Sequence, residues 1–129
     1  MEALCRGVRG AICAGDNTSE AIVAATRELL AAMITANNID PADIASIFFT
    51  VSPDLDAAYP AAAARELGLA EVAMLCAQEI PVPQSPARCI RVLAHWNTTH
   101  PQDAIEHVYL GDAVALRPDR RWPRDNERG

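Results

Sequence analysis

Five short stretches of the chain are rich in apolar residues, some of them continuous and some alternating with polar positions. Such stretches predict β-strands, because successive side chains of a strand point to opposite faces of a sheet. Between them, apolar residues return every three or four positions, which predicts helices that bury one side. The predicted strands cover residues 3–13, 46–51, 72–76, 88–96 and 107–110.

The longest helical pattern follows the first strand. Asn17 and Glu20 have the spacing of a capping box, so we expect the helix to begin there. The apolar stripe continues to about Ala36. Asn37-Asn38 then predicts the end of the helix, because asparagine tolerates the left-handed conformation found there.

Shorter helical segments separate the remaining strands. Residues 60–67 predict a helix that starts at a proline and ends before Gly68, and single turns are expected after Asp40 and within residues 97–105. The resulting order, β-α-β-α-β-β-(α)-β, predicts an α+β (α/β-like) fold with a single mixed β-sheet and helices on one face. The other face would expose apolar surface, which predicts an oligomer.

Length, charge and cysteine content limit the possible classes of protein. The 129 residues fit one domain, assigned to residues 1–118, followed by a polar tail at 119–129. The net charge of −6 argues against a nucleic-acid partner, which would require a basic face. No apolar run reaches the roughly 18 residues of a membrane span, and no signal-peptide pattern is seen. Four cysteines without a CxxC pair favour free thiols in the cytoplasm over a disulfide or zinc site.

The most informative strand contains an arginine. In Cys89-Ile90-Arg91-Val92 the guanidinium keeps its charge, so it must face water, an acid partner or an anionic ligand. Glu79 is an acid in an apolar stretch and precedes a proline-rich loop. Together with other arginines and a tyrosine, these residues would suit a small di-anion, although scattered arginines are more often solvated. The additional residues of this set are Arg9, Arg65, Arg117 and Tyr109.

The sequence contains no nucleophile elbow, glycine-rich phosphate loop, metal motif or paired-acid signature. This points away from hydrolysis, phosphoryl transfer and redox chemistry. Over about residues 4–119 the sequence closely resembles the monofunctional AroH-class chorismate mutases. The matching stretches are CRGVRGAI (5–12), TSEAIVAATRELL (18–30), DIASIFFTVSPDLDAAYPAAAAREL (43–67), MLCAQEIPVP (74–83), RCIRVLAHWNT (88–98) and PQDAIEHVYLGDAVALRPD (101–119).

This resemblance implies a fold, an assembly and a reaction. It implies a ferredoxin-like, chorismate-mutase-type subunit that forms a pseudo-barrel homotrimer with active sites between subunits. The reaction would be the Claisen rearrangement of chorismate to prephenate, in the shikimate pathway to phenylalanine and tyrosine. Neither a cofactor nor a metal would be required, because a one-substrate rearrangement needs conformational restraint and a stabilised polar transition state.

The resemblance also implies three catalytic residues. Arg91 would stabilise negative charge on the breaking ether oxygen, Glu79 would hold the ring hydroxyl, and Cys76 would place a thiol near that hydroxyl. Each residue also has a structural interpretation. Glu79 could be an exposed loop acid, Cys76 a small buried residue, and Tyr109 an interface aromatic.

The remaining site residues would bind substrate. Arg9 and Tyr109 match the pair that holds the side-chain carboxylate, and Tyr59 falls where an aromatic residue packs near the substrate. In the resembling family, residues 59–67 and 75–76 of one subunit face Arg9, Arg91 and Tyr109 of the next. The expected binding set is Arg9, Tyr59, Arg65, Leu75, Cys76, Ala77, Gln78, Glu79, Arg91, Tyr109, Leu116 and Arg117, with Arg65 and Arg117 at the mouth and Leu75 and Leu116 lining the pocket.

Three departures from the family pattern bear on substrate affinity more than on the reaction. Ala62 stands where some members have a lysine, Leu75 replaces a hydroxyl residue found in some members, and the tail beyond Asp119 has no counterpart in the family. Two other functions stay open from the residues. One is a trimeric imine-hydrolysing deaminase, which would need a water-positioning acid for which no motif is found. The other is a non-catalytic binder of aromatic-pathway acids.

Overall fold

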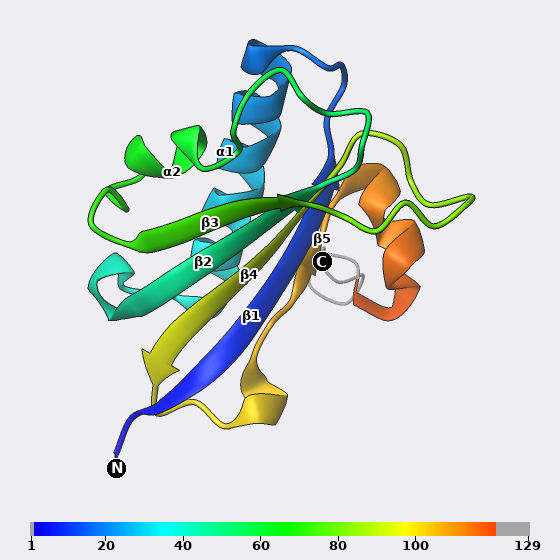
Figure 1. Cartoon of the computed structure of the whole chain (residues 1–129). Helices are drawn as coiled ribbons and strands as arrows, with labels where there is room; N and C mark the ends of the chain where they lie inside the picture. The colour runs from blue at the N-terminus through cyan, green and yellow to red at the C-terminus, as the bar shows by residue number, and fades with distance from the viewer. Residues whose placement is uncertain (1, 121–129) are drawn as a thin grey trace.

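Five strands form one mixed sheet in the computed structural model, which describes residues 2–120 (Figure 1). The strand order is β3-β2-β4-β1-β5. Strand β4 pairs antiparallel with β1 and β2, whereas β1–β5 and β2–β3 are parallel pairs. The predicted single mixed sheet is confirmed. The strands are β1 (Leu4–Cys13), β2 (Ile44–Val51), β3 (Ala73–Gln78), β4 (Cys89–Thr98) and β5 (Val108–Tyr109).

The long helix α1 (Ser19–Asn37) lies across one face of the sheet, behind it in Figure 1. Its N-cap is Thr18, whose hydroxyl accepts the Ala21 N–H at 3.1 Å, so the predicted cap at Asn17 is wrong. Asn17 instead donates from Nδ2 to Asp56 Oδ1 at 2.8 Å and tethers a neighbouring loop. Asn38 adopts the left-handed conformation and confirms the predicted end of the helix.

The main core lies between α1 and this covered face. The side chains of Val8 and Ile12 point towards the helix, and Gly10 between them allows close approach. A Cβ atom at Gly10 would lie 2.6 Å from the sulfur of Met33. The alternation along β1 therefore fixes which face the helix covers.

The second helix is shorter than expected. Residues 60–67 predicted a helix, but only α2 (Ala62–Arg65) is helical, with turns on either side. Gly68 has a φ of +77°, as its predicted place at the helix exit requires. Arg27 of α1 donates to Glu66 at 2.6 Å beside α2, and both helices cover the same face.

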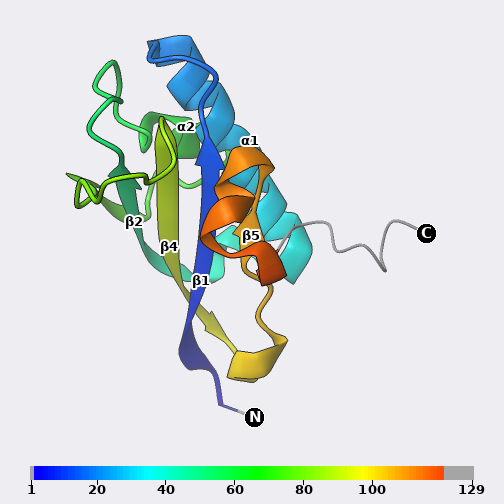
Figure 2. The same ribbon diagram turned by 90° about the vertical axis from the view of Figure 1, so that its right-hand side faces the viewer.

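The opposite face, which we call the open face, is only partly covered. A 3-10 segment that the sequence did not predict, η3 (Gly111–Leu116), packs at the β1–β5 edge against Ala11 and Cys89 (Figure 2). Elsewhere this face exposes Phe48 and Leu75, which are 43% and 63% exposed. The two α-helices do share one face, but η3 does not. The other 3-10 segments are η1 (Pro41–Asp43), η2 (Gln102–Ala104) and η4 (Pro118–Arg120).

The expected polar tail at 119–129 falls largely outside the described residues, since only its first two positions, in η4, are described. Within residues 2–120, no helix combines the length and the apolar composition needed to cross a membrane. The four cysteines are free thiols.

Candidate active site

Arginine and glutamate side chains meet on the open face in a hollow of about 360 Å³, which we call the basic hollow. Strand register explains the meeting. Arg91 of β4 lies opposite Ala11 of β1 and opposite Thr50 of β2, so all three share a face. Arg9 lies two positions before Ala11 on that same face. The lining residues are Arg9, Phe48, Thr50, Glu79, Arg91, Val92 and Leu93.

Glu79 occupies the centre of the polar contacts in the basic hollow. The Thr50 hydroxyl donates to Glu79 Oε2 at 2.8 Å, and Arg91 Nε lies 3.5 Å from the same oxygen. The Glu79 N–H donates to the Val51 carbonyl at 2.8 Å, which ties the residue to the end of β2. Thus Glu79 is the acid partner that the sequence allowed for Arg91, and its position is fixed by β2.

Arg91 keeps an unused donor. Among the described residues, its Nε is the one buried side-chain nitrogen or oxygen without a hydrogen-bond partner. Buried polar groups are nearly always hydrogen-bonded, and the exceptions are explained by a bound water or ion, by strain or by a catalytic role. Within residues 2–120 the Arg9 side chain makes neither a hydrogen bond nor an ion pair. Two guanidinium groups and one carboxylate leave the basic hollow with net positive charge, which suits an anion.

His107 binds the backbone of Arg9 through its imidazole ring. The backbone N–H of Arg9 donates to His107 Nδ1 at 3.0 Å, which requires that ring nitrogen to be unprotonated. Burial lowers the pKa of His107 below its usual range, and the positive charges of Arg120, Arg9 and Arg117 lower it further. The imidazole is therefore held neutral, as the hydrogen bond to Arg9 requires.

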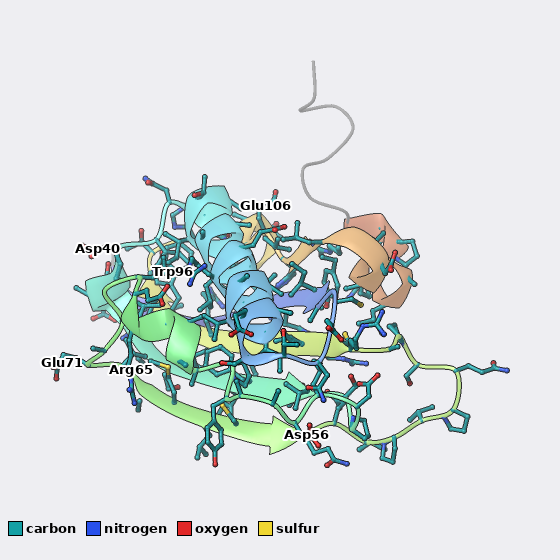
Figure 3. All side chains as sticks on the ribbon, turned by 90° about the horizontal axis from the view of Figure 1, so that it is seen from above. Asp40, Asp56, Arg65, Glu71, Trp96 and Glu106 are labelled. Atoms are coloured by element: carbon teal, nitrogen blue, oxygen red, sulfur yellow. The ribbon has the colours of Figure 1, made fainter. Side chains whose placement is uncertain are left out.

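A second group of predicted site residues lies at the β3 edge, in what we call the edge hollow. Tyr59, Arg65, Leu75 and Cys76 line this hollow of about 580 Å³. Arg65 belongs to α2, close to β3 (Figure 3). The Cys76 side chain shares the covered face with Phe49, its partner on β2. Ala77 and Gln78 line an adjoining hollow with Tyr59 and Cys76.

The third group lies near the end of the described chain. Tyr109 is 2% exposed and packs in the cluster beneath η3. Leu116 lines a hollow of about 800 Å³ that also includes Arg88. Arg117 forms an ion pair with Asp119 at 2.8 Å. Within one chain, therefore, the structure brings Arg9, Glu79 and Arg91 together, but leaves the edge-hollow residues and this third group elsewhere.

The thiol groups near Arg91 are held protonated. Burial raises the pKa of Cys13 to about 12 and also raises the pKa of Cys89. The two cysteines are opposite each other on β1 and β4, and the Arg91 guanidinium only partly offsets the effect on Cys89. These thiols are poor nucleophiles at neutral pH.

Sequence reasoning did not predict Phe48, Thr50, Val92 and Leu93 in the lining of the basic hollow, nor the contact of His107 with Arg9. Thr50 could have been found, because it shares the two-residue period of β2 with the exposed Phe48. His107 could not, because its contact with Arg9 joins residues 98 positions apart along the chain.

Comparison with known proteins agrees with the resemblance found in the sequence. A family model described as chorismate mutase type I matches residues 5–120. Chorismate mutase AroH of Thermus thermophilus is 55% identical over 115 residues, covering 88% of this chain and 94% of that protein. Chorismate mutase AroH of Bacillus subtilis (strain 168) is 41% identical over 123 residues, covering 95% and 97%. The solved structure of a chorismate mutase from Clostridium thermocellum is similar with a TM-score of 0.83 and 48% identity, covering 85% of this chain and 98% of that one. This chain belongs to the chorismate mutase type I family.

Proposed function

We propose that this chain is an isomerase that rearranges chorismate to prephenate without a cofactor. The observation that carries the proposal is that Arg91, next to Glu79, lines a hollow of net positive charge together with Arg9, while the Arg91 Nε makes no hydrogen bond. Family membership and relatives named chorismate mutase AroH support the same reaction. The product would enter phenylalanine and tyrosine synthesis in the cytoplasm.

The mechanism combines restraint of the substrate with a fixed positive charge. Arg91 stabilises the negative charge that develops on the ether oxygen as the carbon–oxygen bond lengthens. Glu79 holds the ring hydroxyl, with Cys76 near it, and Arg9 and Tyr109 bind the side-chain carboxylate. These contacts hold the side chain folded over the ring, which removes most of the entropy cost of reaching the reactive conformer.

We further propose that a homotrimer completes the site. The exposed apolar residues Phe48 and Leu75 lie on the open face, which supports an interface with another copy. The edge hollow and the basic hollow share no lining residue, which supports a site in which one subunit contributes each. The edge hollow would supply Tyr59 and Arg65, and the next subunit would supply Arg91.

A turnover assay on the purified protein, with its mass measured in solution, tests both proposals. We expect loss of chorismate absorbance and a mass three times 13.9 kDa. Binding of chorismate without turnover would instead support a non-catalytic binder, and hydrolysis of an imino acid would support a deaminase.

Mixing two impaired variants, assayed at chorismate concentrations well below KM, tests whether the site spans two subunits. Arg91→Ala removes the central cation, whereas Arg65→Glu places a negative charge on the exposed edge hollow and should repel a di-anion. If each site combines the basic hollow of one subunit with the edge hollow of another, refolding the two variants together restores activity at sites where both halves are intact. Activity no higher than the average of the separate variants would contradict a shared site.

A further inference from the structure

One oxygen atom of Glu79 serves two neighbours in the basic hollow. Oε2 accepts a hydrogen bond from the Thr50 hydroxyl at 2.8 Å, and it faces Arg91 Nε at 3.5 Å. The first distance is that of a good hydrogen bond, whereas the second exceeds the usual N–H···O range of about 2.7–3.2 Å. Glu79 therefore binds Thr50 and only approaches Arg91.

This arrangement is unusual for a carboxylate so close to a guanidinium. Such groups commonly close into a bidentate pair with two short hydrogen bonds of about 2.7–2.9 Å. Here the Arg91 side chain is 30% exposed and the Glu79 side chain 29%, so the pair is largely shielded from solvent. Yet the Arg91 Nε remains buried and without a hydrogen bond.

Strand β2 explains why the pair stays open. It holds Glu79 at two points. The Val51 carbonyl accepts the Glu79 backbone N–H, and the Thr50 hydroxyl donates to the Glu79 carboxylate. Thr50 is directly opposite Arg91 in the β2–β4 ladder, and its hydroxyl fixes the direction of the oxygen that faces Arg91. A carboxylate oxygen can accept from both groups, so the hydrogen bond from Thr50 acts by orienting the carboxylate and not by occupying it.

We propose that Thr50 is a positioning residue, whose hydroxyl holds the Glu79 carboxylate short of a bidentate pair with Arg91. The terminal N–H groups of Arg91, which a bidentate pair would occupy, then remain available to an acceptor atom of the substrate, and Glu79 keeps its other oxygen for a substrate hydroxyl. This role rests on the proposed function, because it assigns Arg91 and Glu79 to the bound substrate. Thr50 itself acts through these two residues.

Steady-state kinetics of three variants test the role. Thr50→Val keeps the branched shape that suits a strand but removes the hydroxyl, so Glu79 can close on Arg91. Because this weakens rather than removes the cation, we expect kcat to fall about tenfold, less than the roughly 10²–10³-fold loss of a whole oxyanion donor. Thr50→Ser should restore kcat to within about threefold of the unaltered chain, since it keeps the hydroxyl. Ser46→Ala is the matched control, because it removes another β2 hydroxyl on the same face, one that contacts His95 at 2.9 Å, and should leave kcat unchanged.

A double-mutant cycle separates this role from a merely structural one. Without the Glu79 charge there is no ion pair to hold open, so Thr50→Val should cost less than about twofold in a Glu79→Gln background. An equal loss in both backgrounds, or a Thr50→Val kcat equal to that of the unaltered chain, would overturn the proposal. Thr50→Ala takes the place of Thr50→Val if the valine variant does not fold.

An NMR measurement keeps this test independent of catalysis. The Arg91 Nε–H resonance, assigned by its loss in Arg91→Lys, should shift and exchange more slowly with water in Thr50→Val, but not in Thr50→Ser. An unchanged resonance in Thr50→Val would also overturn the proposal. If the unaltered chain did not turn over chorismate, the proposed function would fail, while this resonance would still decide whether Thr50 holds the pair open.

Discussion

The two faces of the sheet use the same strands for different purposes. On the covered face, Val8, Ile12 and Ile90 are buried against α1 in a continuous apolar core. On the open face, Arg9 and Arg91 occupy the intervening positions of β1 and β4 and remain partly accessible. Because strand side chains alternate, a single residue step separates a core position from a site position.

This difference explains how arginines can be held rigidly without being fully desolvated. The covered face fixes the strand positions through dense packing, and the backbone ladders transmit that order to the open face. The charges themselves lie where solvent or a ligand can reach them, which avoids the large cost of burying an unpaired ion. The free energy of unfolding should therefore depend mainly on the covered face, and catalysis mainly on the open face.

The largest expected effect is on the open face. Arg91→Ala should lower kcat by about 10²–10³-fold, equivalent to roughly 3–4 kcal/mol, because it removes the donor that we propose stabilises the developing charge. The melting temperature should change little, since this side chain is partly exposed. Arg6→Ala is a matched control, because Arg6 is on the same sheet but donates to the His100 carbonyl. An Arg91→Ala enzyme within a few-fold of the Arg6→Ala enzyme would contradict the role of Arg91.

The next effect compares the two faces through a pair of glycines on β1. Gly10→Ala should destabilise the fold by about 1–3 kcal/mol, because the new Cβ would lie 2.6 Å from Met33 Sδ and push α1 away. Gly7→Ala should change the unfolding free energy by no more than about 0.5 kcal/mol, since its Cβ meets only Leu93, on the open face, at 3.4 Å. Denaturant unfolding of both variants measures the difference. Equal losses would show that the two faces do not differ in packing as described.

A smaller effect is expected at the edge hollow, where α2 of the covered side brings a cation to the β3 edge. Arg65→Ala should raise KM for chorismate about fivefold with little change in kcat, because an exposed charge aids capture of a di-anion. The increase should shrink at high salt, which screens exposed charges. KM measured at low and high ionic strength checks this. An equal fall in kcat would instead place Arg65 in the chemical step.

The sequence was sufficient for the framework but not for the assembly of the site. The strands, the long helix and the role of Gly68 follow from local patterns, and the single mixed sheet is as predicted. The boundaries of α2 were missed because residues 60–67 keep a helical pattern on both sides of Ala62–Arg65, and η3 was missed because it depends on packing against Ala11, Cys89 and Tyr109. Local order alone does not decide such ends.

Site residues differ in the same way. Arg91 stands out in the sequence because a permanent charge interrupts an apolar strand. Its proximity to Glu79, however, depends on the pairing of β2 with β4, and this pairing joins segments about 40 residues apart in the chain. Thr50 carries no charge that would draw attention; the two-residue period of β2 predicts its face, but its contact with Glu79 at 2.8 Å is needed to identify its role.

The smallest expected effect concerns the support behind the open face, at His107. Its pKa in the folded chain lies below the ordinary 6.5, so the folded state binds fewer protons than the unfolded state around that pH. The contribution of His107 to the free energy of unfolding is therefore fully present above about pH 6.5, and it is lost as the pH falls from there through the lower pKa of the folded state. Protonation of His107 would also break the hydrogen bond from the backbone N–H of Arg9, because Nδ1 could no longer accept it.

His107→Gln should remove this pH dependence while keeping the contact, since the glutamine carbonyl can accept from Arg9 and does not titrate. Between about pH 7 and pH 5, the melting temperature of the unaltered chain should fall more than that of His107→Gln, because only the unaltered chain takes up a proton at this position. Asp54, whose pKa is lowered by a hydrogen bond from Ser52, titrates below 3.8 and does not contribute in this range. Melting curves of both proteins that stay parallel from neutral to mildly acidic pH would show that His107 is not held neutral by its surroundings. The support of Arg9 would then have to come from strand pairing alone.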